Sequence, residues 1–420
     1  MLDRKSAPQF AEIKDFHLPS PEILELTNRT PIVLFQDVQQ QVLKIELVFK
    51  AGKWFEPKLG VAHFTAQMLE KGTANKTSYQ IAQTFDKFGC SIEVSAGFDF
   101  TSISLYFLSK NINKVLPLFC EIVTSPSFPE SEFQLMKDVF RQNLKINNKK
   151  NSYVAGKAVR QNIFGEQHPY GGSIEADDVD KIIREDLLSF FNNYFALHEV
   201  YVTGYLSPSI KQSLISELSG IKSTTPIQIT KAVPIITGAF SQHIEISGSV
   251  QASLRLGKKT INRSHPDYAA LVLLNHILGG YFGSRLMKNI REEKGLTYGI
   301  HSSLNTLKND ALFLIGTDVN RETQDIAFAE IKSEINKLIE EPVERTELEI
   351  TKNHLLGSLQ LETANPFSIL EKIKAIRLNQ LNPNFYSKLF TDILTTDAAT
   401  LKRVAQSHLQ TVSLFEVSAG

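Results

Sequence analysis

The second half of this 420-residue chain repeats the pattern of the first, and this repeat constrains the fold more than any other feature. A strand pattern followed by a helical pattern over residues 101–122 aligns with residues 309–331. Further on, a Pro turn and a second helical pattern over 126–144 align with 341–359. The same order at a near-constant offset of about 207 to 215 residues indicates duplication of one α+β unit.

Charged residues also align between the two copies. Glu132 matches Glu347, and Lys137 matches Lys352. The alternative is chance similarity between two strand–helix–helix segments, which the aligned charges disfavour. We therefore predict an α+β fold with two homologous halves, each a mostly antiparallel sheet with helices packed on one face.

The stretch over residues 219–237 separates the two copies. It is rich in Ser, Thr and Pro and lacks a sustained helical period, which is typical of a linker. We predict an N-terminal domain over 1–218, a linker over 219–237 and a C-terminal domain over 238–420. Two domains also suit the length of the chain.

Hydrophobic periodicity predicts the elements of the first copy. The predicted strands cover residues 31–38, 42–52, 91–98 and 101–108, and the predicted helices cover 60–71, 79–88, 112–124, 130–149 and 154–165.

Composition excludes several classes of partner. Lys+Arg and Asp+Glu number 45 each, and a neutral chain without a basic stripe argues against nucleic acid. No apolar run has the length of a signal peptide or a membrane span, so we expect a cytoplasmic protein that does not bind membranes. Cys90 and Cys120 lie in apolar contexts, which predicts two buried, reduced thiols.

The predicted helix near residues 59–73 carries a polar face. Val61, Phe64 and Met68 form its apolar stripe, whereas His63 and Gln67 lie one turn apart on another face. Two histidines at this spacing could grip a metal ion, but here only His63 is a histidine. On residue chemistry alone, His63 is a lone polar residue.

The segment over residues 278–304 contains a second group of interest. A flexible loop over 279–283 precedes a helix with Ser284 as its N-cap, and Gly295 ends that helix before a strand begins at Leu296. Arg291 near the helix end could simply complement the helix dipole. Tyr298, on the same strand parity as Leu296, could simply belong to the core.

The first of these segments resembles the H-x-x-E-H helix of the pitrilysin/insulinase-type metallopeptidases, the inverzincins. The first zinc histidine of that motif is His63 here, the water-activating glutamate is Ala66 and the second zinc histidine is Gln67. The family's third ligand, a glutamate on a later helix, falls on Asn143. The resemblance therefore implies a degenerate zinc motif and no catalytic metal in this chain, because amide oxygens bind Zn²⁺ weakly.

The second segment resembles the family's R-E-x-x-G-L-x-Y signature, with Arg291 and Tyr298 at the matching positions. In the family this pair binds the substrate backbone and the oxyanion of the tetrahedral intermediate. Two weaker matches, H-P-Y-G at residues 168–171 and the strand-end Gly204, extend the resemblance over nearly the whole chain. We interpret His168 as structural.

The combination implies an incomplete enzyme that is similar to the processing peptidases. The expected function is that of an inactive, zinc-less subunit of a heterodimeric metallopeptidase, which contributes Arg291 and Tyr298 to the cleavage of unstructured peptides. The expected partner is a homologous subunit that carries the zinc motif and the zinc, and the two chains would enclose a chamber built from four repeats. The alternative is a structural subunit with no part in hydrolysis, and whether a homodimer forms in isolation is left open.

Overall fold

The structure is a computed structural model that describes residues 15–37, 41–223 and 240–420. The first half forms a six-stranded sheet in the order β1-β2-β6-β3-β5-β4, antiparallel except between β2 and β6. Its strands are β1 (Glu22–Glu25), β2 (Pro31–Gln36), β3 (Val42–Phe49), β4 (Ser91–Ala96), β5 (Thr101–Leu108) and β6 (Leu197–Gly204).

The second half forms a five-stranded sheet in the order β7-β11-β8-β10-β9. Its strands are β7 (Ser241–Ile244), β8 (Gln251–Lys259), β9 (Ile300–Thr306), β10 (Ala311–Asn320) and β11 (Phe415–Ala419). Only the β7–β11 pair is parallel, as is the equivalent β2–β6 pair of the first sheet. Apart from the additional β1, the two sheets have the same strand order, which confirms two halves of like topology.

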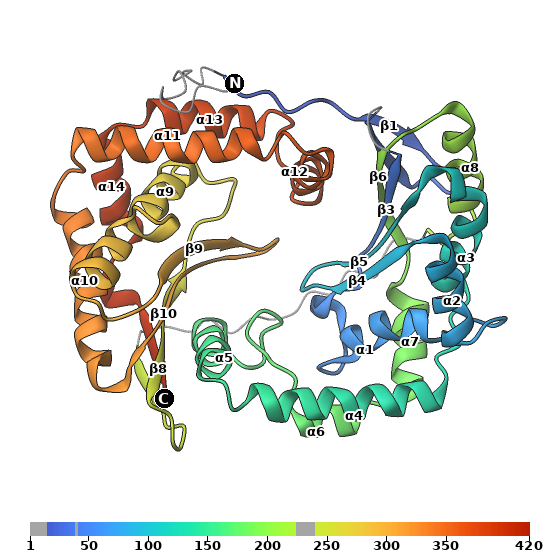
Figure 1. The fold of residues 1–420 in the computed structure, drawn as a ribbon, viewed down its shortest axis with the longest axis horizontal. Helices are drawn as coiled ribbons and strands as arrows, with labels where there is room; N and C mark the ends of the chain where they lie inside the picture. Colours follow the sequence, from blue (N-terminus) through green and yellow to red (C-terminus); the bar gives the residue numbers. More distant parts are fainter. Residues whose placement is uncertain (1–14, 38–40, 224–239) are drawn as a thin grey trace, which may run out of the picture.

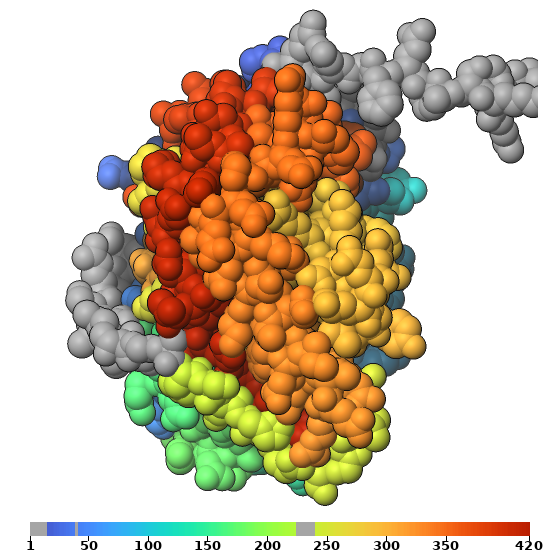
Figure 2. Space-filling model, turned by 90° about the vertical axis from the view of Figure 1, so that its left-hand side faces the viewer, coloured from blue at the N-terminus to red at the C-terminus, as the bar shows by residue number. Residues whose placement is uncertain are grey.

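The helices follow the same repeat. The first half contains α1 (Val61–Met68), α2 (Ser78–Phe88), α3 (Ile112–Thr124), α4 (Glu130–Asn147), α5 (Asn151–Phe164), α6 (Ala176–Lys181), α7 (Arg184–Tyr194) and α8 (Pro208–Leu218). The second half contains α9 (Tyr268–Asn275), the π-helices η4 (His276–Gly280) and η5 (Met287–Glu293), α10 (Gln324–Glu340), α11 (Arg345–Leu361), α12 (Pro366–Leu378), α13 (Phe385–Thr395) and α14 (Ala398–His408). Figure 2 shows the helices of the second half, in orange and red, covering its outer face.

The aligned lysines make the same contact in both halves. Lys137 Nζ on α4 donates to the carbonyl of Ile182 at 2.9 Å, and Lys352 Nζ on α11 donates to the carbonyl of Leu394 at 2.8 Å. Burial lowers the pKa of both amines below the usual lysine value. Conserved contacts of this kind support duplication over chance similarity.

The aligned glutamates also occupy equivalent places. Glu132 is the third residue of α4 and accepts a hydrogen bond from Ser78 at 2.5 Å. Glu347 is the third residue of α11 and receives two hydrogen bonds, of 2.7 and 2.9 Å, from Arg285. Both partners lie near the start of the helical segment that follows the first helix of their half.

Each half lends one helix to the sheet of the other (Figure 1). Helix α5 packs on β8 and β11 of the second sheet, and α12 packs on β6 of the first. The apolar contacts of α12 involve Val33, Val48 and Tyr201, which lie on the face of the first sheet opposite its own helices. The prediction of helices on one face therefore holds within each half, while the exchanged helices cover part of the other face.

The exchanged helix α12 is also fixed by charged side chains. Glu371 accepts from Lys44 at 2.8 Å, and Lys374 donates to Glu46 at 2.8 Å. One turn further on, Arg377 donates to Glu199 at 2.5 Å. Lys44, Glu46 and Glu199 are all buried on the first sheet. Lys44 and Glu46 also pair with each other at 2.9 Å, and Glu199 also accepts from the Tyr201 hydroxyl, so the partners from α12 complete an existing buried network.

A third contact joins the tip of the β9–β10 hairpin to the first half. The hydroxyl of Tyr170 donates to Asp99 at 2.7 Å and accepts the backbone N–H of Asn309 at 3.2 Å. Burial and the nearby Asp99 carboxylate raise the pKa of Tyr170 well above its ordinary value, so the phenol stays protonated.

The predicted linker over 219–237 lies mostly outside the described residues. Its first residues are described: Ile221 is buried in the first core, and the backbone N–H of Leu197 donates to the carbonyl of Lys222 at 2.9 Å. The domain boundaries stay predictions. Cys90 and Cys120 are both free thiols; Cys120 is buried as predicted, whereas the prediction of a buried Cys90 is wrong because it is only half-buried. Within the described ranges, no helix combines the length and apolar character that a bilayer-crossing segment needs.

Arg377→Ala tests the contact between α12 and the first sheet. We expect the free energy of unfolding to fall by about 3 kcal/mol, because the change leaves the buried Glu199 carboxylate without an opposite charge and with the neutral Tyr201 hydroxyl as its remaining side-chain partner among the described residues. The side chains of Arg377 and Glu199 are 27% and 6% exposed. Arg345→Ala is the control, because it breaks a pair whose side chains are 91% and 61% exposed, and it should leave the free energy of unfolding nearly unchanged. Urea unfolding measures both, and equal losses would contradict the importance of the exchanged contact.

Candidate functional site

Helix α1 carries the degenerate zinc motif. Its N-terminus is capped by Glu56, whose carboxylate accepts the backbone N–H groups of Gly60 at 3.0 Å and Ala62 at 3.1 Å. Ala66 is fully buried, whereas Gln67 is half-buried and donates to the backbone carbonyl of Val94 at 3.3 Å. The side chain at the second histidine position therefore ties α1 to strand β4.

His63 points toward α4. Its ring lies 5.1 Å from the ring of Phe140 and 5.5 Å from that of Phe64, between centroids. Burial lowers the pKa of His63 below its ordinary value, so the imidazole is neutral near pH 7. Asn143, one turn beyond Phe140 on α4, is exposed. A cavity of about 170 Å³, lined in part by His63, opens beside this cluster.

These side chains do not suit a catalytic zinc ion. A zinc site of this class needs two imidazoles and a carboxylate, and the matching positions offer one imidazole and two amides. The buried methyl group of Ala66 cannot accept a proton from water. The chemistry of the donor set therefore gives no metal-activated nucleophile at this position.

Another group of residues has metal-ligand chemistry. Among the described residues, His265, Asp267 and His408 form the one group of three whose ligand atoms lie within 4.8 Å of one another. Asp267 already pairs with Arg403 at 2.7 Å and with His408 at 3.0 Å. Hydrogen bonds from Arg403 and then His408 lower the pKa of Asp267 to about 2, so the cluster is satisfied as an ion pair.

Arg291 lies on the π-helix η5. Leu286, Met287 and Ile290 are all buried in the second core, so this helical segment packs with one apolar face inward. The guanidinium of Arg291 stacks on the ring of Phe282, with 4.6 Å between the guanidinium carbon and the ring centroid. Arg291 forms no hydrogen bond or ion pair with another described residue, so its donors are free for a ligand.

Side chains of α10 hold η5 in place. Asn289 donates to Glu330 at 3.0 Å and to Glu334 at 2.7 Å, and Lys294 pairs with Glu330 at 3.1 Å. Gly295 then adopts a φ of +62°, and the backbone N–H of the next residue returns to the carbonyl of Ile290 at 2.9 Å. The end of the helix and the following residues are therefore held in one geometry.

Tyr298 is the most exposed large side chain of the region, at 94%. Its neighbour Thr297 fixes the backbone: the hydroxyl donates to the carbonyl of Asp318 at 2.8 Å and accepts from Thr317 at 2.9 Å. Tyr298 is therefore a solvent-exposed phenol on an anchored backbone, with no hydrogen bond to a described residue. The alternative of a core tyrosine is wrong.

Three local predictions for this segment need correction. Strand β9 begins at Ile300, so Tyr298 precedes the strand. The hydroxyl of Ser284 is buried without a hydrogen-bond partner among the described residues, so its side chain does not cap the helix. Gly279, predicted to lie in a flexible loop, lies within η4. A Cβ atom at this position would lie 2.7 Å from the backbone nitrogen of Ser302, so close packing requires glycine here.

Other motif residues have structural places. His168 is buried between aromatic rings and accepts the backbone N–H of Tyr170 at 2.9 Å, which confirms its structural interpretation. Gly204 ends β6 with a φ of +128°, where a Cβ atom would lie 2.2 Å from the carbonyl oxygen of Val42. Sequence analysis did not identify Phe282 as the stacking partner of Arg291. The two residues are nine positions apart, and only the turn between them brings them into contact.

Comparison with known proteins gives consistent matches. The family model described as insulinase (peptidase family M16) matches residues 32–177, and the model described as the peptidase M16 inactive domain matches residues 181–355. An uncharacterized zinc protease of Bacillus subtilis is 24% identical over 352 residues, which are 82% of this chain and 84% of that protein. A protein of Helicobacter pylori named a non-peptidase homolog is 24% identical over 374 residues, 87% of this chain and 86% of that one. A crystal structure of a peptidase M16 inactive domain from Pseudomonas fluorescens superposes with a TM-score of 0.87 at 26% identity, over 95% of this chain and 98% of that chain.

Zinc binding tests the degenerate motif. We expect the purified protein to hold no stoichiometric Zn²⁺, because His63 is the one strong ligand among the motif positions. The double variant Gln67→His/Asn143→Glu should gain one zinc per chain, because it restores all three ligand types where α1 faces α4. Gln67→His/Gln142→Glu is the matched control, with the carboxylate one residue earlier on α4.

Elemental analysis after dialysis measures all three proteins. One zinc per wild-type chain that is lost in His63→Ala would overturn the metal-free interpretation. Equal zinc contents in the two double variants would show that position 143 does not face His63.

Proposed function

Because the chain belongs to the M16 (insulinase/pitrilysin) peptidase family, we propose that it is the zinc-less subunit of a two-chain peptidase. In this proposal its catalytic contribution is the pair Arg291 and Tyr298. A homologous subunit with an intact H-x-x-E-H motif supplies the metal site. The substrate is an unstructured peptide.

The state of the Arg291/Tyr298 segment is the observation that carries this proposal. Residues kept only for packing are buried or paired, but Tyr298 is almost fully exposed and Arg291 contacts only the face of Phe282 through its charge. The surrounding backbone is nevertheless anchored to β10 and α10. Donors held in a fixed geometry without internal acceptors are what stabilisation of a developing negative charge requires.

The division of labour follows from the chemistry of each half-site. A guanidinium and a phenol can both donate hydrogen bonds to the carbonyl oxygen of a scissile peptide bond as it becomes an oxyanion. Neither group can activate water at neutral pH, because both lack a free basic atom. This chain therefore needs a partner that brings the nucleophile.

The edge strands supply a means of peptide recognition. Strand β9 pairs only with β10 among the described strands, and it begins two residues after Tyr298. A peptide without structure of its own can add to such an edge through backbone hydrogen bonds, with little dependence on its sequence. A peptide aligned along β9 would pass beside the Tyr298 hydroxyl.

Substitutions at the pair distinguish a catalytic helper from a scaffold. We expect Arg291→Ala or Tyr298→Phe to lower kcat of the two-chain complex by about 100-fold or more, the usual effect of losing one oxyanion donor. The melting temperature and partner binding should hardly change, because neither substitution opens a core cavity. The measurement is kcat and KM on a fluorogenic unstructured peptide, with each chain alone and with both together.

Tyr79→Phe is the matched control, because Tyr79 is an exposed tyrosine on α2 that is 71% exposed. It should leave kcat unchanged. Wild-type kcat in both Arg291→Ala and Tyr298→Phe would favour the structural subunit. Chelator-sensitive cleavage by this chain alone would refute the division of labour.

A further inference from the structure

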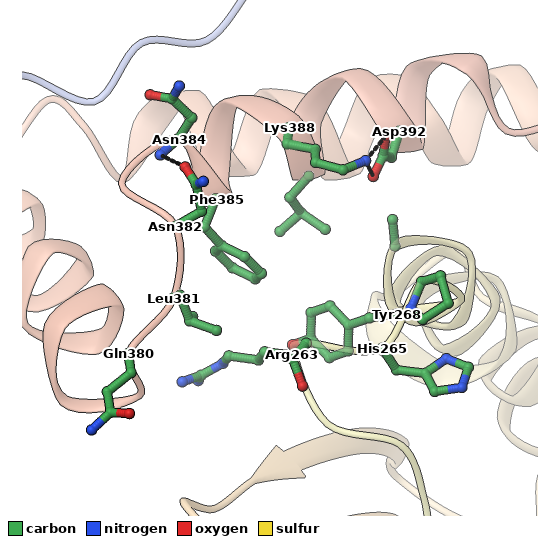
Figure 3. A pocket seen from close by; sticks show the side chains of 14 residues that line it. Arg263, His265, Tyr268, Gln380, Leu381, Asn382, Asn384, Phe385, Lys388 and Asp392 are labelled. Atoms are coloured by element: carbon green, nitrogen blue, oxygen red, sulfur yellow. Dashed lines mark hydrogen bonds and ion pairs between the residues drawn. The ribbon is translucent and has the colours of Figure 1, made fainter.

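A cavity in the second half (Figure 3) is lined by none of Arg291, Tyr298 and the zinc-motif positions. It has a volume of about 690 Å³, which is within the range of small-molecule sites. One wall is the β8–α9 connection and the first turn of α9. The opposite wall is the turn between α12 and α13 together with the first two turns of α13.

The walls are mainly apolar. Tyr268 and Phe385 pack against each other in the cavity wall with ring centroids 6.2 Å apart, and Leu381 and Leu389 complete the lining from the α12–α13 side. Figure 3 shows Tyr268, Phe385 and Leu381 directed into the same space. Such a surface favours an apolar ligand body of roughly the size of one aromatic ring.

The charged side chains of the cavity are not equivalent. Lys388 and Asp392 pair with each other at 2.6 and 2.8 Å, so neither offers a net charge. Arg263 forms no hydrogen bond or ion pair with another described residue. Its side chain extends toward the turn that carries Gln380 and Leu381 (Figure 3). The cavity therefore presents one uncompensated guanidinium next to an apolar surface.

We propose that this cavity binds a small carboxylate with an apolar body, with the carboxylate on Arg263 and the body against the apolar wall that Tyr268 and Phe385 form. The planar fork of a guanidinium can bind both oxygens of a carboxylate, and the apolar wall beside it suits the organic body of such an acid. The neighbouring amides of Gln380 and Asn382 can donate further hydrogen bonds. A free organic acid and the C-terminal residue of a short peptide share this chemistry. The inference does not depend on the proposed peptidase function.

Calorimetry with three matched probes tests the site. N-acetyl-phenylalanine represents a peptide C-terminus, 3-phenylpropionate represents a free acid, and N-acetyl-phenylalaninamide keeps the ring but lacks the charge. We expect at least one of the two acids to bind with one site per chain, and the amide to bind at least tenfold more weakly. Tighter binding of N-acetyl-phenylalanine would identify a peptide end as the source, and tighter binding of 3-phenylpropionate would identify a free acid.

Arg263→Met removes the charge and keeps the length of the side chain. It should weaken binding of the preferred acid by about 10- to 100-fold, as expected for loss of a charge-assisted hydrogen bond. Lys388→Met is the matched control, because Lys388 is already neutralised by Asp392, and it should change the affinity less than threefold. The melting temperature of each variant without ligand verifies folding, and the acid should raise it in the wild type and in Lys388→Met but not in Arg263→Met.

Several outcomes would overturn the proposal. These are binding of neither acid at millimolar concentration, equal binding of acid and amide, or equal affinities in wild type and a folded Arg263→Met. If Arg263→Met does not fold, Arg263→Lys replaces it. Because a lysine keeps the charge but loses the bidentate geometry, unchanged binding to this variant would exclude the recognition described here.

Discussion

The exchange of α5 and α12 between the halves is the constraint on which the rest of the structure depends. Each sheet has its own helices on one face, but its other face also carries large apolar side chains, such as Tyr201 in the first sheet and Phe415 in the second. Water on these faces would cost about 25 cal/mol for each Å² of apolar surface. Because each half covers the exposed face of the other, the two halves fix each other's position, and with it the relation between α1 and η5.

Electrostatics gives this exchange its register. Three acidic and three basic side chains meet between the first sheet and α12, so the buried cluster is neutral as a whole. Burial alone would lower the pKa of Lys44, but Glu46 and Glu371 outweigh burial and hold it above its ordinary value. A shift of α12 by one helical turn would separate the pairs between α12 and the sheet, whereas its apolar stripe would still face the sheet, because that stripe recurs with the helical period. The charges thus specify one alignment, although buried pairs add little net stability.

The sequence predicted much of the fold because local patterns carry it. The helices α3 (Ile112–Thr124) and α4 (Glu130–Asn147) and the strand β5 (Thr101–Leu108) follow from periodicity, and the repeat follows from aligned residues. The exchange of helices could not be predicted from the sequence, because the apolar stripe of α5 would be the same whichever of the two sheets it covers. The exposure of Tyr298 could not be predicted either. The alternation of apolar and polar residues already begins at Leu296 and suggests a strand there, whereas β9 begins only at Ile300. The contact between Phe282 and Arg291 depends on a turn that no period encodes.

The altered motif residues on α1 serve packing and backbone contacts in place of metal binding. A glutamate at the fully buried position 66 would lose its hydration without gaining a partner. Two histidines at positions 63 and 67 without a metal ion would leave polar nitrogens unpaired beside apolar rings. Ala66 removes the first cost, and Gln67 uses its amide to bind the backbone of β4. Both changes favour packing over chemistry, in line with the general trade-off between stability and activity. The segment around Arg291 and Tyr298 has not changed in this way: its charge and its phenol still lack partners within the described chain, which is the asymmetry that a division of labour between two subunits would produce.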